Sequence, residues 1–161
     1  MLRHLLLLSL LPAIALAQEP KAKTHQVKLN GHNFTLPDGF TIELAAKTPL
    51  VDRPIVAAFD DKGRLYVADS SGSNEKPELQ LKNPTHRIMR LEDTKGTGVF
   101  DKATVFADKM MFPEGVMWLK GSLYVGAPPH IWKLTDTDDD GKADKREIWF
   151  DGKTLKGLGP R

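Results

Sequence analysis

Two stretches of this chain match each other and decide the fold: IMRLEDTKGTGVFDKATVF (88–106) and IWKLTDTDDDGKADKREIWF (131–150). At an offset of 43 residues, their Ile, Leu, Asp and Gly positions align. A second pair, GRLYVAD (63–69) and GSLYVGA (121–127), matches at an offset of 58 residues. Self-similarity at a fixed period indicates a repeat architecture. The sequence therefore contains two copies of one structural unit.

The two offsets differ by 15 residues, so the first copy contains an insertion of that length. The insertion lies within the segment SSGSNEKPELQLKNPT (70–85), which is polar and rich in turn residues. With this insertion set aside, one repeat of about 43 residues explains both matches.

Each copy holds four short apolar runs separated by Gly, Asp and Pro clusters, a pattern typical of strands. The runs are 55–59, 65–68, 87–91 and 103–106 in the first copy, and 115–119, 123–126, 131–134 and 147–150 in the second. Four antiparallel strands in about 40 to 45 residues are typical of one propeller blade. A sandwich rarely repeats at a fixed period, and solenoid coils are shorter. We expect an all-β fold, a partial β-propeller of about two four-stranded antiparallel blades at about 53–108 and 112–151.

The N-terminus has the layout of a secretory signal peptide. A basic start at Arg3 precedes the apolar run 5–11, and Ala15 and Ala17 are the small residues before a cleavage point. This run is shorter than the ~20 residues that span a bilayer. We therefore expect cleavage after Ala17, export to the periplasm or the extracellular space, and no membrane span in the mature chain.

Three segments follow from these boundaries. Residues 1–17 are the expected signal peptide. Residues 18–35 are polar without a sustained period, and we expect a flexible leader there that pairs at most through Thr24–Leu29. Residues 36–161 are the expected incomplete propeller, which begins at the turn signal Leu36-Pro37-Asp38-Gly39.

The composition excludes several classes of function. The chain has no cysteine, so it forms no disulfide, carries no thiolate nucleophile and has no CxxCH haem attachment site. Its 23 Lys and Arg residues nearly balance its 21 Asp and Glu residues. Because binding to phosphate backbones requires a concentrated basic surface, this balance argues against nucleic acid as a partner.

The meander order predicts which loops share an end of the sheets. The insertion 70–85, the segment Pro128-Pro129-His130 and the crossover Met110–Glu114 should lie together at one end. The acidic loop 136–144 should lie at the opposite end.

That acidic loop satisfies the oxygen-ligand pattern of an EF-hand calcium loop, with Gly141 at the turn position. The predicted Ca²⁺ ligands are Asp136, Asp138, Asp140, Asp144 and Glu147. Its flanks read as strands rather than helices, so a bound ion would have a structural role. The alternative is a solvated acidic turn, since Asp and Gly are common in turns. The matching loop 93–101 lacks the middle aspartates and is expected to bind nothing.

Five polar residues are candidates for a binding site around the propeller channel, at the end opposite the acidic loop. They are Arg53, Asp69, Arg87, Glu114 and His130. Each has a structural alternative: Arg53 and Glu114 flank prolines at blade entries, where a structural ion pair is the competing interpretation, and His130 begins a strand.

Three long stretches carry a family resemblance: LPDGFTIELAA (36–46), PLVDRPIVAAFDDKGRLYVAD (49–69) and FPEGVMWLKGSLYVGAPPHIWKLTDTDDDGKADKREIWFDG (112–152). They resemble the N-terminal β-propeller of planctomycete-type proteins described as membrane-bound dehydrogenases, which are similar to glucose/sorbosone dehydrogenase propellers. The resemblance implies six blades, a pyrroloquinoline quinone near the axis and oxidation of a sugar. It also implies that the catalytic histidine and the quinone-binding residues belong to later blades, so it assigns no catalytic residue here.

We therefore expect a truncated N-terminal fragment of an exported propeller protein related to quinone-dependent sugar dehydrogenases, inactive alone. Its partners would be the remaining blades or other subunits. Two alternatives remain open: a non-catalytic NHL-like propeller module that binds carbohydrate or protein, and a small secreted calcium-binding protein. Two blades leave open sheet edges and an uncovered apolar face, which promote association. The isolated chain is thus expected to be marginally stable or to aggregate.

Overall fold

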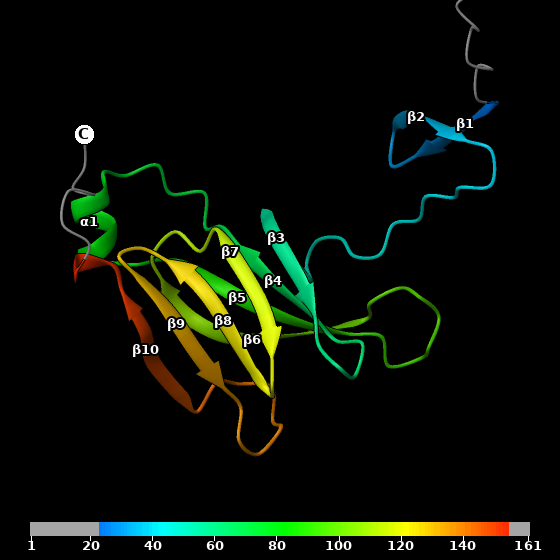
Figure 1. Ribbon diagram of the computed structural model, residues 1–161. Coiled ribbons are helices and arrows are strands. Elements are labelled where there is room, and N and C mark those ends of the chain that lie inside the picture. Colours follow the sequence, from blue (N-terminus) through cyan, green and yellow to red (C-terminus); the bar gives the residue numbers. More distant parts are fainter. Residues whose placement is uncertain (1–22, 155–161) are drawn as a thin grey trace, which may run out of the picture. The chain divides into compact units, whose positions relative to one another are not determined.

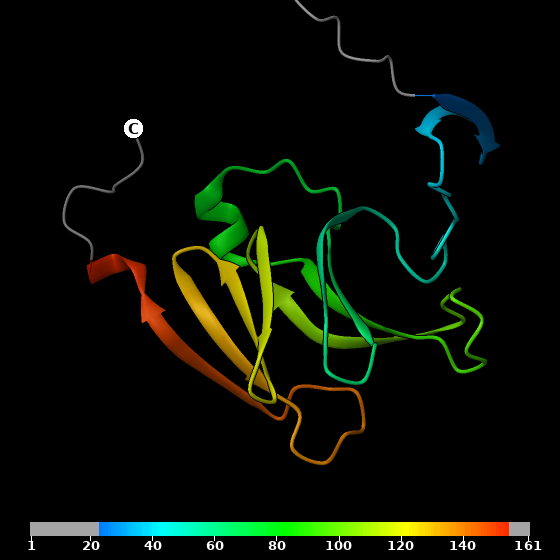
Figure 2. The ribbon, with the colours of Figure 1, turned by 45° about the vertical axis from the view of Figure 1, so that its right-hand side comes forward.

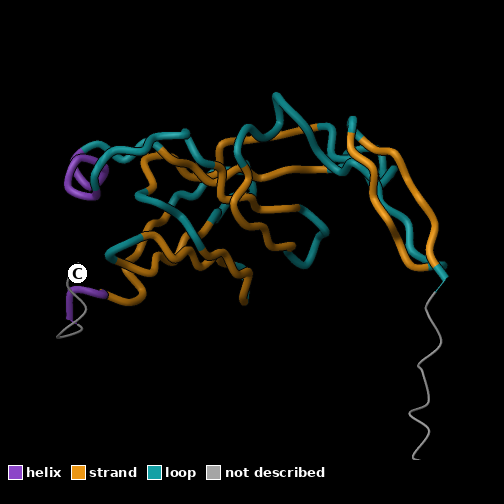
Figure 3. Tube along the Cα trace, turned by 90° about the horizontal axis from the view of Figure 1, so that it is seen from above, coloured by secondary structure: helices purple, strands orange, loops and turns teal. Residues whose placement is uncertain are grey.

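The computed structural model describes residues 23–154. The predicted signal peptide at 1–17 lies outside the described residues. The chain divides into two compact units between Glu43 and Leu44. Apart from two short helices, the regular structure is antiparallel strand (Figures 1 and 3), so the predicted all-β class is confirmed. Within the described range, no helix has the length and apolar character needed to cross a membrane.

The first unit contains one hairpin, in which β1 (Thr24–Leu29) pairs with β2 (His32–Pro37). Asn30 and Gly31 connect the strands with φ values of 49° and 82°. Positive φ at both positions is what a type I′ turn requires, and Asn-Gly is a strong hairpin signal. The prediction of a flexible leader at 18–35 did not take this turn into account. The turn allows Thr24–Leu29 to pair with His32–Pro37.

The second unit contains two four-stranded meanders. The first sheet consists of β3 (Pro54–Phe59), β4 (Leu65–Asp69), β5 (His86–Glu92) and β6 (Lys102–Met110). The second consists of β7 (Gly115–Leu119), β8 (Ser122–Ala127), β9 (His130–Thr135) and β10 (Lys145–Asp151). In both sheets each strand pairs antiparallel with the next strand in sequence. The eight strands predicted from the repeat are therefore all present, in the predicted order.

The insertion between β4 and β5 carries the helix α1 (Pro77–Lys82), and the helical turn η1 (Gly152–Thr154) follows β10. Pro77 occupies the start of α1, where its missing N–H leaves no intrahelical bond unmade. In both ribbon views α1 lies at one end of the sheets and the loop between β9 and β10 at the other (Figures 1 and 2). The predicted opposition of these two loops is confirmed.

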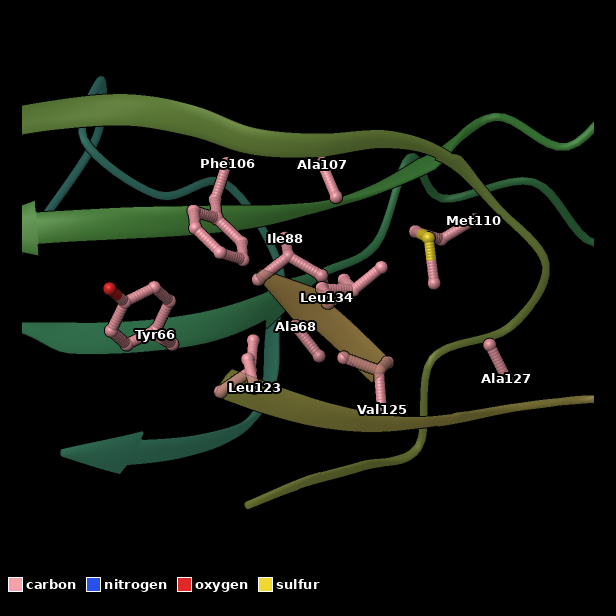
Figure 4. Close-up of a cluster of buried hydrophobic side chains, with 10 residues drawn as sticks. All are labelled: Tyr66, Ala68, Ile88, Phe106, Ala107, Met110, Leu123, Val125, Ala127 and Leu134. Atoms are coloured by element: carbon pink, nitrogen blue, oxygen red, sulfur yellow. The ribbon is translucent and has the colours of Figure 1, made fainter. Parts of the chain in front are cut away.

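The two sheets pack face to face over one apolar core. Figure 4 shows ten of its side chains, which come from both sheets. They are Tyr66, Ala68, Ile88, Phe106, Ala107, Met110, Leu123, Val125, Ala127 and Leu134. At the border of this core Tyr66 stacks on Trp118, with ring centroids 5.3 Å apart. The first strands of the two sheets, β3 and β7, lie next to each other.

A smaller core covers the other face of the first sheet. Val67, Met89 and Leu91 are buried there against Val51 and Phe100. The segment before β3 thus closes this face of the first sheet. A backbone bond ties it in place, because Phe100 N–H donates to the Ala45 carbonyl at 2.8 Å.

Candidate functional site

The acidic loop joins β9 to β10 and brings three carboxylates together. One oxygen from each of Asp136, Asp138 and Asp144 lies within 4.8 Å of the other two. The Asp136 side chain is only 6% exposed, whereas Asp138 and Asp144 are exposed. Within residues 23–154 this is the group of acidic side chains whose geometry suits a metal ion.

Each of the three carboxylates uses one oxygen to hold the loop. Asp136 Oδ2 accepts the Gly141 N–H at 2.9 Å, and Asp138 Oδ1 accepts the Asp140 N–H at 3.2 Å. Asp144 Oδ2 accepts both the N–H and the hydroxyl of Thr137, at 2.7 and 2.8 Å. These bonds to Thr137 lower the pKa of Asp144 below its ordinary value. The second oxygen of each of the three carboxylates lies outside these bonds.

The second oxygen of Asp136 is exceptional. Asp136 Oδ1 is buried and has no hydrogen-bond partner among the described residues. Buried polar atoms are nearly always hydrogen-bonded, so an unpartnered carboxylate oxygen requires an explanation.

The other two predicted ligands lie apart from this group. Asp140 Oδ1 accepts the Lys142 N–H at 2.8 Å. Glu147 lies in β10, where its Oε2 is 3.5 Å from Lys133 Nζ of β9. Strand pairing thus takes Glu147 out of the loop, and the structure gathers three of the five predicted ligands.

Basic residues of the first sheet reach into the acidic loop, a feature that the repeat pattern did not predict. Arg90 Nη1 lies 3.1 Å from Asp136 Oδ2. Asp139 pairs with Arg64 and, at 2.7 Å, with Lys62 Nζ. Arg64 first, and Lys62 second, hold the pKa of Asp139 well below its usual range. The loop therefore docks on the first sheet through ion pairs.

Arg90 is the central residue of this docking. Its side chain is only 3% exposed, and Nη2 lies 3.2 Å from Glu92 Oε1. Gly141 permits the approach: a Cβ there would lie 2.6 Å from Arg90 Nη2. The glycine therefore serves a cross-sheet contact as well as the turn.

The loop 93–101 of the first sheet is organised by the same kind of bonds. Asp93 Oδ2 accepts the Gly98 N–H at 2.7 Å, and Asp101 Oδ1 accepts the Thr94 N–H at 2.9 Å. Lys95 Nζ lies 3.2 Å from Asp101 Oδ2. A lysine, Lys95, thus stands where the second repeat has the middle aspartate Asp138.

The five predicted channel residues fall into separate groups at the opposite end. Asp69 is fully buried and accepts the Arg53 N–H at 2.8 Å and Arg87 Nη2 at 2.7 Å. His130 Nδ1 lies 3.1 Å from Asp151 Oδ1. The Glu114 N–H donates to the Gly126 carbonyl at 2.9 Å, and Glu114 and His130 line one shared pocket. The Asp69 group holds the entry of β3, which is a structural role.

The loops at this end lie together, as the meander order predicts. Leu81 of the insertion, Met111 of the crossover and Pro129 line one pocket. Sequence reasoning missed His86, the buried first residue of β5. Its Nε2 lies 2.9 Å from Gln80 Oε1, and its Nδ1 accepts the Ser71 N–H at 3.1 Å.

Comparison with known proteins gives one family. Residues 27–157 match the family model described as "Domain of unknown function (DUF7133)". No curated protein and no solved structure matches the chain. Because the matched range covers most of the chain, including both four-stranded sheets and all but the first residues of β1, the chain belongs to this family of proteins with a domain of unknown function.

Proposed function

We propose that the two sheets are consecutive blades of a β-propeller, and that this chain is the scaffold portion of an exported protein related to quinone-dependent sugar dehydrogenases. On this proposal the chain supplies blade faces for further blades and no catalytic residues. Export and the dehydrogenase relationship rest on the sequence. The blade assignment is supported by the packing of the sheets.

One observation carries the blade assignment: the two sheets stack through non-equivalent faces. The first sheet contributes Tyr66, Ala68 and Ile88 to the shared core, and the second contributes Leu123 and Val125. In the repeat alignment, Leu123 and Val125 correspond to residues on the opposite face of the first sheet. A stack of this kind can continue in one direction, as blades do around a propeller axis.

The face of the second sheet that corresponds to the Tyr66 face is not covered by any segment among residues 23–154. Tyr124 and Ile131 are the repeat counterparts of Tyr66 and Ile88. Trp149, 61% exposed, packs edge-on against Tyr124, and Met117, opposite Tyr124 in the strand register, is 51% exposed. Large apolar side chains in such a cluster mark an interaction surface. By the repeat, its occupant is another four-stranded sheet that presents a Leu-Val face.

The neighbouring first strands give further support. β3 lies beside β7, and Tyr66 of the next strand stacks on Trp118 of β7. In a propeller the first strand of each blade lines the central channel, so first strands of successive blades are neighbours. A sandwich built from the same eight strands has no reason to place them together.

Sedimentation velocity on the mature chain tests the docking face. The wild type should self-associate in a concentration-dependent manner, because its Tyr124 face is uncovered. Met117→Lys combined with Trp149→Lys should reduce this association. Leu79→Lys, which charges an equally exposed side chain on α1, is the matched control and should not. A wild-type monomer at about 100 μM, or an equal effect of the control, would contradict the blade assignment.

An activity assay tests the scaffold assignment separately. The purified chain is mixed with pyrroloquinoline quinone, Ca²⁺, a panel of sugars and an artificial electron acceptor. Turnover should not exceed that of a heat-inactivated sample. Sugar-dependent reduction of the acceptor would show that this portion of the protein carries catalytic groups.

A further inference from the structure

Asp136 has hydrogen-bond partners within the described structure at only one of its two carboxylate oxygens. Its Oδ2 accepts Arg90 Nη1 at 3.1 Å and the Gly141 N–H at 2.9 Å. Its Oδ1 is buried without a hydrogen-bond partner. Leaving a buried carboxylate oxygen unpaired is costly, because the oxygen has lost its water and gained nothing in exchange. No described residue satisfies Oδ1, so the site is open to a further group.

The surroundings of Asp136 define the charge of that group. Asp138 and Asp144 each bring one carboxylate oxygen to within 4.8 Å of the Asp136 group. Three negative charges at this spacing repel one another, and the repulsion is strongest where a member is shielded from water. Arg90 cannot neutralise all three, since it also lies 3.2 Å from Glu92 Oε1. The group is therefore a cation.

The donor atoms define which cation. The cluster offers carboxylate oxygens and no imidazole or thiolate, the donor set that Ca²⁺ prefers over transition metals. Ca²⁺ also accepts irregular coordination completed by water and backbone carbonyls, whereas Mg²⁺ demands near-ideal octahedral geometry. We propose that Asp136, Asp138 and Asp144 bind one Ca²⁺ ion, and that this ion fixes the acidic loop in the position in which it docks on the first sheet.

Ligand residues and docking residues alternate in the acidic loop, so an ion bound to the loop also affects how the loop docks on the first sheet. Asp136 turns one oxygen to Arg90 of β5, and Asp139 pairs with Lys62 and Arg64 of the β3–β4 connection. Asp139 lies between the ligands Asp138 and Asp144 in sequence, so ordering the ligands orders Asp139. The ion thus acts on the contact between the two sheets without touching the first one. This site is independent of catalysis and of the number of blades.

Calorimetric titration of the mature chain with CaCl₂, after removal of metal with a chelator, tests the ligand set. The wild type should bind one Ca²⁺. Asp138→Asn, a change at an exposed ligand, should weaken binding at least tenfold. Asp140→Asn is the matched control in the same loop, because its side chain bonds to Lys142 N–H and lies outside the group; it should change affinity less than threefold. No heat up to about 10 mM CaCl₂, or an equal loss in Asp140→Asn, would overturn the site.

A third variant tests the link to docking. Asp139→Asn removes the ion pairs to Lys62 and Arg64 and leaves the three ligands in place. If ion binding and docking are coupled, this variant should bind Ca²⁺ about fivefold or more weakly, as is usual for coupled sites. In the wild type, CaCl₂ should also raise the melting temperature, and Asp138→Asn should abolish that rise. Unchanged affinity in Asp139→Asn would overturn the coupling.

Discussion

Arg90 Nη1 of β5 lies 3.1 Å from Asp136 Oδ2, so a guanidinium of one sheet meets a carboxylate of the other at a point closed to water. Both side chains are almost fully buried. Replacing one member of such a pair lowers the free energy of unfolding more than replacing both members by apolar residues, because the remaining charge stays buried and uncompensated. The junction of the two sheets therefore depends on this contact as well as on the apolar core.

We predict that Arg90→Met lowers the free energy of unfolding by about 3 to 5 kcal/mol. Urea denaturation followed by tryptophan fluorescence measures it. Lys95→Ala is the control: Lys95 is exposed and pairs with Asp101 within a surface loop, so the change should cost far less than Arg90→Met. Similar losses in the two variants would show that the Arg90 pair is exposed to solvent.

Gly141→Ala should disturb the same contact from the loop side. Gly141 has a φ of 99°, and an added Cβ would lie 2.6 Å from Arg90 Nη2. Gly96→Ala isolates the backbone effect, since Gly96 has a φ of 66° with nothing within 4 Å of an added Cβ. Positive φ alone costs about 1 to 2 kcal/mol. We expect Gly141→Ala to lose more stability than Gly96→Ala in the same denaturation experiment, and equal losses would mean that Arg90 moves aside freely.

The fold of the second unit could be predicted because its sequence pattern occurs twice in the chain. The stretch 88–106 matches 131–150, and two copies of one pattern give the number of strands and their order. The hairpin of the first unit has no second copy. Its evidence is the single dipeptide Asn30-Gly31, which a search for periodicity passes over.

The candidate site could be predicted only in part, for a different reason. The spacing of Asp136, Asp138 and Asp144 is local, and local spacing survives folding. The position of Glu147 is decided by strand pairing with Lys133, which places it outside the loop. The approach of Arg90 is decided by the packing of two sheets, and no pattern within one repeat indicates which side chain of a neighbouring repeat reaches a loop.

The core between the sheets gives a direct test of the packing. Leu134 is fully buried in β9, and Leu119 in β7 is exposed on the outer face of the same sheet. Leu134→Ala should cost about 2 to 5 kcal/mol, because it removes transfer free energy and leaves a cavity. Leu119→Ala should cost less than about 1 kcal/mol. The reverse order in urea denaturation would mean that the second sheet packs on the first through its other face.

His86 makes the stability of the chain depend on pH between 5 and 7. Burial lowers the pKa of His86 below its ordinary value of 6.5. The Ser71 N–H donates to Nδ1, which assigns the proton to Nε2 facing Gln80 Oε1, so a second proton would have to displace a donor. The folded state therefore binds fewer protons than the unfolded state below pH 6.5, and the stabilisation present above that pH is lost as the pH falls.

We therefore predict that the free energy of unfolding decreases from pH 7 to pH 5, with a slope of at most about 1.4 kcal/mol per pH unit for this single group. Urea denaturation at half-unit intervals measures the slope. In His86→Gln the slope should flatten even though the variant is less stable at pH 7, because the titrating group is gone. His32→Gln, at an exposed position of β2, should keep the wild-type slope. The lowered pKa values of carboxylates such as Asp144 and Glu92 act below pH 4.5 and do not contribute to the slope between pH 5 and 7. A His86→Gln variant with the same slope as the wild type would therefore contradict the role of His86.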